Sequence, residues 1–140
     1  MFIALFKGLM LTFKNFFRKP FTFQYPETKL AVPERFRGRP ELLCNANNQM
    51  ICVACGLCEK VCPSQCITVI PETGGDGIRC LKNYILNLNR CSFCGFCVDA
   101  CPVDAIRMSS AYELAAYSKE DLILDKEKMR ANGCAHHSGI

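Results

Sequence analysis

The chain has 140 residues, 50% of them hydrophobic, and a formal net charge of +4, which fits one small domain with extensions. The positive charge is too small and too dispersed to indicate nucleic acid as a partner. Twelve cysteines are many for this length. Because eight of them follow a metal-binding pattern, we expect a reducing, cytoplasm-facing compartment and not a disulfide-bonded secreted protein.

Residues 1–19 predict an amphipathic helix. At 100° per residue, nine large apolar side chains fill one arc of roughly 160°, with basic side chains opposite. The apolar set is Phe2, Ile3, Leu5, Phe6, Leu9, Met10, Phe13, Phe16 and Phe17, and the basic set is Lys7, Lys14 and Arg18. The segment is too short and too charged to span a bilayer, and we expect no signal peptide. We expect it to lie on a membrane surface or a membrane subunit; the alternative is a helix packed on its own domain.

Residues 20–43 predict an extended docking arm. Pro20 ends the helix, and the segment contains four prolines with little periodicity. Its aromatic residues are Phe21, Phe23, Tyr25 and Phe36. Because solvated linkers rarely carry so many large apolar groups, we expect the arm to be ordered by lying on a partner. The alternative is a solvated linker.

Two copies of one cysteine pattern lie within residues 44–110. The first is Cys52-x2-Cys55-x2-Cys58-x3-Cys62-Pro63, and the second is Cys91-x2-Cys94-x2-Cys97-x3-Cys101-Pro102. Each position of the second copy follows its counterpart by 39 residues, since 91 − 52 = 39. This is the run of bacterial two-cluster ferredoxins, in which the fourth cysteine of each half binds the other half's [4Fe–4S] cluster.

Each cluster is therefore expected to bind three cysteines of one run and the last of the other. Cluster 1 takes Cys52, Cys55, Cys58 and Cys101, and cluster 2 takes Cys91, Cys94, Cys97 and Cys62. Gly56 and Gly95 follow the second cysteine of each loop, where a side chain would crowd the cluster or oppose the backbone conformation. A zinc site fits poorly because its ligand pairs are usually separated by longer loops. A disulfide framework fits poorly because no secretory signal is present.

The residues around the two runs predict an α+β, ferredoxin-like module. We expect a short strand at 49–51, a helix at 57–62, a strand at 67–70, a turn at 71–77, a return strand through Tyr84, Leu86 and Leu88, a second loop and helix, and a closing strand at 106–108. Such a small core cannot hold its shape by apolar burial alone, so we expect the metal to contribute to stability.

Four cysteines lie outside the duplicated pattern. Cys66 stands where the second half has Ala105, so we interpret it as a small buried residue and not a ligand. Cys44, Cys80 and Cys134 are also predicted not to be ligands, because a further cluster would need more cysteines at the same spacing.

The C-terminal helical segment is expected at residues 111–133. Ser118 followed by Asp121 is typical of a capping box, which predicts a helix at 119–132 that ends at Gly133. The tail, 134–140, contains His136 and His137. We expect a disordered end there, with a metal site as the alternative.

Beyond the cysteine runs, the sequence resembles the two-cluster iron–sulfur subunit I of respiratory complex I, the NADH–quinone oxidoreductase. The segments that carry the resemblance are Tyr25-Pro26 with Lys29, Val32-Pro33-Glu34-Arg35-Phe36-Arg37-Gly38-Arg39, Cys91-x2-Cys94-Gly95-Phe96-Cys97, Ala100-Cys101-Pro102-Val103-Asp104-Ala105-Ile106, Tyr112-Glu113-Leu114-Ala115, Asp121-Leu122 and Leu124-Asp125-Lys126-Glu127. The cysteine runs occur in many ferredoxins, whereas the arm and the late segments are more specific to this family.

The resemblance implies a peripheral subunit that relays single electrons through two [4Fe–4S] clusters toward a terminal cluster and a quinone site. The implied partners are the terminal-cluster subunit and a membrane subunit that forms the quinone chamber, at the cytoplasmic face of the inner membrane. No catalytic acid, base or nucleophile is expected, because electron transfer makes no bonds in the protein. The alternatives are the equivalent subunit of a membrane-bound hydrogenase or deazaflavin-cofactor dehydrogenase, and a free soluble ferredoxin, which the apolar first helix disfavours.

Overall fold

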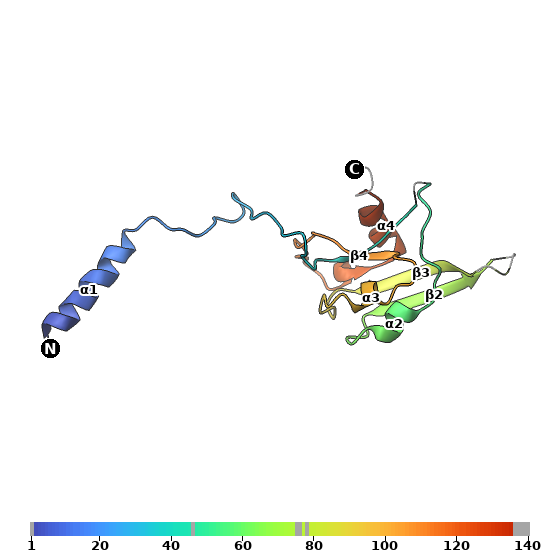
Figure 1. Ribbon diagram of the computed structural model, residues 1–140, viewed down its shortest axis with the longest axis horizontal. Coiled ribbons are helices and arrows are strands. Elements are labelled where there is room, and N and C mark those ends of the chain that lie inside the picture. The colour runs from blue at the N-terminus through green and yellow to red at the C-terminus, as the bar shows by residue number, and fades with distance from the viewer. Residues whose placement is uncertain (1, 46, 75–76, 78, 136–140) are drawn as a thin grey trace. The chain divides into compact units, whose positions relative to one another are not determined.

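The chain forms two compact units, Met1–Ala31 and Val32–Ile140. The computed structural model describes residues 2–45, 47–74, 77 and 79–135, with side chains described as far as residue 130. Figure 1 traces both units from the N-terminal helix to the C-terminal one. The mixed helix and strand architecture that the sequence predicts is confirmed.

The first unit is one helix followed by an extended segment. Helix α1 runs over Phe2–Phe16, and it ends shortly before Pro20 because proline cannot continue a helix. Its apolar side chains are exposed, with Phe2 at 83% and Phe16 at 81%. The predicted helix is therefore present, and the described residues of its own unit leave its apolar face uncovered. None of the described helices is long and apolar enough to cross a membrane.

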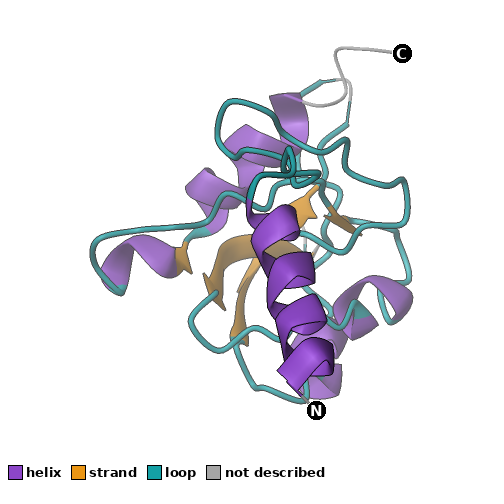
Figure 2. Ribbon diagram, turned by 90° about the vertical axis from the view of Figure 1, so that its left-hand side faces the viewer, coloured by secondary structure: helices purple, strands orange, loops and turns teal. Residues whose placement is uncertain are grey.

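Two antiparallel sheets form the frame of the second unit (Figure 1, Figure 2). Strands β2 (Ile67–Thr73), β3 (Arg79–Asn87) and β5 (Ile123–Leu124) make one sheet in that order, and β1 (Pro40–Leu42) pairs with β4 (Ile106–Met108). The short helices α2 (Leu57–Val61) and α3 (Phe96–Asp99) contact each other, and α4 (Lys126–Ala135) contacts β1, β3 and β5. The two cysteine loops lead into α2 and α3.

One apolar core joins these elements. Tyr84 and Leu86 of β3, Leu42 of β1 and Met129 of α4 are fully buried in it. Since alternate residues of a strand face the same side, Tyr84, Leu86 and then Leu88 all enter the core, as the predicted return strand requires. Cys58 and Cys97 belong to the same buried cluster, so both loops are anchored on the core. The positions of the two cysteine loops are therefore fixed by packing on the sheet as well as by the loops themselves.

Strand β2 is longer than the sequence predicts. The expected turn begins at Pro71, whereas β2 continues through Pro71 to Thr73, which pairs with Arg79. The pairing register shifts between Ile70 and Pro71, and β2 lies at the edge of its sheet, where a residue without an N–H group is tolerated. The strand expected at 49–51 is reduced to an isolated antiparallel bridge between Cys44 and Met50.

The last part of the predicted arm belongs to the second unit and pairs with another strand of it. In β1 and β4, Pro40 lies opposite Met108. Just before β1, the N–H of Gly38 donates to the carbonyl oxygen of Ser109 at 3.0 Å. A Cβ on Gly38 would collide with the carbonyl oxygens of Ser109 and Ala111, so glycine permits this close approach. The sequence did not predict β1, because a proline opens it and the prolines around it indicate irregular chain.

The C-terminal helix begins later than predicted. Ser118 Oγ bonds to the Asp121 carboxylate at 3.0 Å and does not cap a helix, and residues 120–124 form a 3₁₀ turn (η1, Glu120–Leu122) followed by β5. Asp125 is the true cap, since its Oδ1 accepts from the N–H of Lys128 at 2.8 Å. Helix α4 extends to Ala135, so the predicted stop at Gly133 is also wrong.

Candidate functional site

The two cysteine loops repeat the same backbone conformation 39 residues apart. Left-handed φ angles occur in pairs: 51° at Ala54 and 53° at Phe93, 77° at Gly56 and 84° at Gly95, and 47° at Gln65 and 48° at Asp104. A Cβ on Gly56 would meet no described atom within 4 Å. The glycine is therefore required by the backbone conformation, which was one of the two reasons expected from the sequence. The duplicated spacing thus produces a duplicated loop structure.

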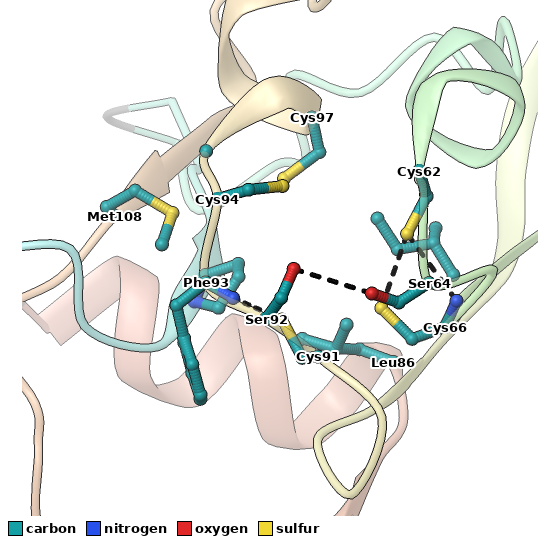
Figure 3. Close-up of a pocket in the computed structure, with 13 residues that line it drawn as sticks. Cys62, Ser64, Cys66, Leu86, Cys91, Ser92, Phe93, Cys94, Cys97 and Met108 are labelled. Carbon is teal, nitrogen blue, oxygen red and sulfur yellow. Dashed lines mark hydrogen bonds between the residues drawn. The ribbon is translucent and has the colours of Figure 1, made fainter.

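The four thiols predicted for cluster 2 line one cavity (Figure 3). Cys91, Cys94 and Cys97 come from the second loop and α3, whereas Cys62 comes from the C-terminal end of α2 in the first half. The remaining lining is largely apolar and includes Ile67, Leu86 and Met108. The fold therefore brings the last cysteine of the first run to the three loop cysteines of the second.

Backbone N–H groups point at equivalent sulfurs in the two halves. The N–H of Cys66 donates to Cys62 Sγ at 3.5 Å, and the N–H of Ala105 donates to Cys101 Sγ at 3.2 Å. These donors favour the thiolate form. Burial raises the pKa of Cys62, but hydrogen bonds from Cys66 and the N–H of Ser64 outweigh it and lower the pKa overall. The position is therefore suited to a negatively charged, metal-binding sulfur.

The thiols predicted for cluster 1 are also neighbours. Burial raises the pKa of Cys52, and the nearby thiols of Cys101 and Cys55 raise it further. Burial raises the pKa of Cys58 as well, with a further increase from Cys52 and a partly offsetting hydrogen bond from Tyr84. Cys101 of the second half therefore shares the electrostatic environment of the first loop.

The two sets of thiols adjoin each other. The pKa of Cys97 is raised to about 11 by burial and then by the thiols of Cys91, Cys58 and Cys94. Cys58 belongs to the first set and Cys97 to the second, so one cluster site lies next to the other. Because burial and neighbouring thiols raise the pKa of Cys52, Cys58 and Cys97, these three thiols favour the protonated form in the metal-free chain. Metal binding must therefore release protons from them.

This donor set fits iron–sulfur clusters. Cysteine thiolates are their usual ligands, and each thiolate binds its own iron. Among the described residues, no three His, Cys, Asp or Glu side chains converge as the ligands of a single ion do. The thiols of the second set are instead arranged around a cavity.

Two residues outside the runs also reach the cysteine loops. The Tyr84 hydroxyl donates to Cys58 Sγ at 3.9 Å, and Arg37 Nη1 donates to the carbonyl oxygen of Cys94. The sequence placed Tyr84 in a core strand and Arg37 in the arm, but it predicted neither contact. Arg37 belongs to the family-specific segment 32–39, which was a signal that this residue has a function. No local sequence pattern links Tyr84 with Cys58.

The cysteines outside the runs have different surroundings. Cys66 is buried, as expected, and its Sγ lies 3.4 Å from Cys62 Sγ; burial raises the pKa of its thiol. Cys44 is buried beside Met50, and Cys80 is exposed, with its thiol 3.4 Å from the carbonyl oxygen of Glu72. That none of them is a ligand stays a prediction. The Cys134 side chain, His136 and His137 lie outside the described part of the chain.

Comparison with known proteins identifies both the domain and the family. Residues 51–105 match the 4Fe-4S dicluster domain family. NADH-quinone oxidoreductase subunit I 2 of Geobacter metallireducens is 40% identical over 129 residues, which cover 92% of this chain and 98% of that protein. NADH-quinone oxidoreductase subunit I 1 of Geobacter sulfurreducens is 44% identical over 131 residues, covering 92% and 97%.

A solved structure shares the fold. It is a chain of the membrane-bound sulfane sulfur reductase, an archaeal respiratory membrane complex, with a TM-score of 0.53 and 28% identity. The match covers 80% of this chain and 56% of that one, so this chain spans little more than half the length of that neighbour. The cofactors of the dicluster domain are two [4Fe–4S] clusters. From these similarities and the two sets of thiols, the chain belongs to the NADH-quinone oxidoreductase subunit I family.

Proposed function

We propose that this chain is the electron-relay subunit of a membrane-bound NADH–quinone oxidoreductase and passes single electrons toward a terminal cluster and a quinone site. The observation that supports the proposal is the cavity that Cys62 of the first run lines together with Cys91, Cys94 and Cys97 of the second, beside the buried cluster that contains Cys58 and Cys97. A relay needs two redox groups side by side, and this arrangement supplies both sites within one core.

The ligand sets follow from the same arrangement. Cluster 1 is held by Cys52, Cys55, Cys58 and Cys101, and cluster 2 by Cys91, Cys94, Cys97 and Cys62. When bound, each [4Fe–4S] cluster accepts and releases one electron at a time.

The chain's own residues hold and tune the two sites. The N–H groups of Cys66 and Ala105 stabilise negative charge on Cys62 and Cys101. Leu86 and Ile67 line the second cavity with apolar side chains. A dry, prearranged site needs little reorganisation when charge changes, which favours fast transfer.

The exposed apolar face of α1 supports docking at a membrane. Eight large apolar side chains on this short helix, with Phe17 just after it, bury well in an interface, while Lys7, Lys14 and Arg18 suit anionic headgroups or a polar partner surface. In this proposal residues 1–19 lie at the cytoplasmic face of the inner membrane against the subunit that forms the quinone chamber. Residues 20–43 are the docking arm, 44–110 the cluster module, 111–133 the C-terminal helical segment and 134–140 the tail.

A second candidate is the equivalent subunit of a respiratory complex whose electron acceptor is not quinone. The likeness to a chain of the sulfane sulfur reductase complex favours it, because that respiratory complex acts on sulfane sulfur. The curated relatives weigh more, since their identity is higher and covers nearly their whole length.

Isolation of the complex from native membranes separates these candidates. A tag on the C-terminal tail is used for purification in detergent, and the partner subunits are identified by mass spectrometry. Electron paramagnetic resonance should show two interacting cubane signals, reduced by NADH and reoxidised by quinone. Reduction by a donor other than NADH, or reoxidation only by another acceptor, would favour the second candidate. Absence of cubane signals under anaerobic conditions would contradict both.

A further inference from the structure

The cavity of the second cluster site contains one thiol more than a cubane binds. Its lining includes the four cysteines of the second set and also Cys66 (Figure 3). The Sγ atoms of Cys62 and Cys66 lie 3.4 Å apart, and Cys66 is 6% exposed. Cys66 therefore contacts a sulfur of the set without belonging to it.

The chemistry of a metal ligand decides which of the two sulfurs, Cys66 or Cys62, donates the hydrogen bond. A cysteine that binds iron does so as a thiolate, which has no proton to donate. Cys66 stands outside the ligand set, so it keeps its S–H group. In the loaded protein the hydrogen bond therefore runs from Cys66 S–H to Cys62 Sγ.

The second half has no such donor beside Cys101. Ala105 is the counterpart of Cys66, 39 residues later, and its methyl group cannot donate a hydrogen bond. The backbone contacts at the two positions match, since the N–H of Cys66 donates to Cys62 Sγ as the N–H of Ala105 donates to Cys101 Sγ. The surroundings of Cys62 and Cys101 are therefore alike in their backbone hydrogen bonds. They differ in the side chain, which is a thiol at residue 66 and a methyl group at residue 105.

We propose that Cys66 is a positioning residue whose S–H hydrogen bond to Cys62 raises the reduction potential of the second cluster. The inference rests on the ligand set proposed for that cluster. Hydrogen bonds to the sulfurs are among the factors that set the potential of an iron–sulfur cluster. A donor withdraws negative charge from the thiolate and so stabilises the reduced, more negative form. Cys66 itself exchanges no electron and makes no bond to iron.

The test is a redox titration of the full-length chain, loaded with iron and sulfide under anaerobic conditions and followed by electron paramagnetic resonance. The signal of the second cluster is identified as the one that Cys94→Ser alters. In Cys66→Ala, this signal should titrate at a lower potential, while the first cluster and the iron content stay as in the wild type. Alanine fits here because the second half carries it, as Ala105, at the same place. Cys66→Ser keeps a donor and should restore the potential toward the wild-type value.

Three results would overturn the proposal. If both potentials are unchanged in Cys66→Ala while both cubane signals persist, the hydrogen bond has no effect, and the proposed function stands. If Cys66→Ala loses the iron of one cluster, Cys66 is a ligand and not a donor. Failure of the proposed function is distinct, since the wild type would then show no pair of cubane signals. Ala105→Ser adds a donor beside Cys101 and should raise the potential of the first cluster; an unchanged potential in a folded variant would also count against the proposal.

Discussion

Arg37 donates a hydrogen bond from Nη1 to the carbonyl oxygen of Cys94, 57 positions later in the chain. The guanidinium group also lies 3.5 Å from where a Cβ on Gly95 would be. Arg37 of the arm therefore stabilises the second cysteine loop through a contact with its backbone. Arg37→Met, which keeps much of the side-chain length, should weaken this loop by about 1 kcal/mol, because the contact is exposed to solvent.

The measurement for Arg37→Met is the rate at which a chelator removes iron from the loaded protein. We expect faster loss from the second cluster and an unchanged rate for the first. Arg35→Met is the matched control, since Arg35 is exposed and lies two residues away in the same arm. Equal effects of the two substitutions would show that the contact with Cys94 does not matter.

The crossed ligand sets predict the result of replacing Cys101 by Ser. Cys101 lies in the second run but shares the electrostatic environment of Cys52, so its loss should alter the cluster of the first loop. Serine is a poorer ligand for iron than a thiolate, so we expect a shifted or lost signal from one cubane. Electron paramagnetic resonance and iron analysis measure this.

The comparison for Cys101→Ser is Cys55→Ser, which lies in the first run. Both substitutions should affect the same cubane signal, because both residues are proposed to hold cluster 1. If Cys101→Ser instead matches Cys94→Ser, each run binds its own cluster and the crossed assignment is wrong.

Tyr84 is fully buried, and its hydroxyl lies 3.9 Å from Cys58 Sγ. Tyr84→Phe removes this donor and keeps the ring in the core. We expect a lower potential for the first cluster and a loss of about 1 kcal/mol of stability. A redox titration and thermal unfolding of the loaded protein measure the two effects. A shift confined to the second cluster would show that the hydroxyl acts elsewhere.

Gly38 lies where the chain before β1 meets the backbone that follows β4. In Gly38→Ala, the added Cβ would overlap the carbonyl oxygens of Ser109 and Ala111, so the segment must move. We expect a loss of about 1–3 kcal/mol, visible as a lower midpoint of thermal unfolding. Gly8→Ala in α1 is the control, because its Cβ would meet no described atom within 4 Å. An equal midpoint for the two variants would mean that this close approach contributes nothing.

The apolar face of α1 predicts where the chain is found in the cell. The double variant Leu9→Glu and Phe13→Glu places two carboxylates on that face, which should release the loaded chain from the membrane fraction. Ala4→Glu and Asn15→Glu make the same charge change outside the apolar arc and should leave membrane association intact. Iron content should be unchanged in both double variants. Retention of the first variant on membranes would mean that α1 is not what docks the chain.

The features that sequence reasoning predicted well are those fixed by short spacings. The cysteine runs dictate two equivalent loops, and the alternation of Tyr84, Leu86 and Leu88 dictates a strand that faces the core. Contacts between distant segments leave no such local trace. β1 and β5 are short strands that form because a partner strand is present, and the hydrogen bonds of Arg37 and Tyr84 depend on the finished fold.

The error at the C-terminal helix has a local cause. Ser118 and Asp121 have the spacing of a capping box, but their side chains bond to each other. Leu124, which a helix beginning at residue 119 would include, instead pairs with Leu86 in the sheet. A sequence pattern cannot distinguish these outcomes, because the gain from completing the sheet lies outside the segment itself.

The crossed ligand sets proposed for the two clusters would impose an order on biosynthesis. As the chain leaves the ribosome, the first three cysteines of the leading loop emerge well before Cys101, and Cys62 emerges before any of its three companions. With the crossed sets, no site is complete until the second run has been synthesised. The cellular machinery that delivers iron and sulfide would then act only after the second run has been translated, and it would not load one half before the other.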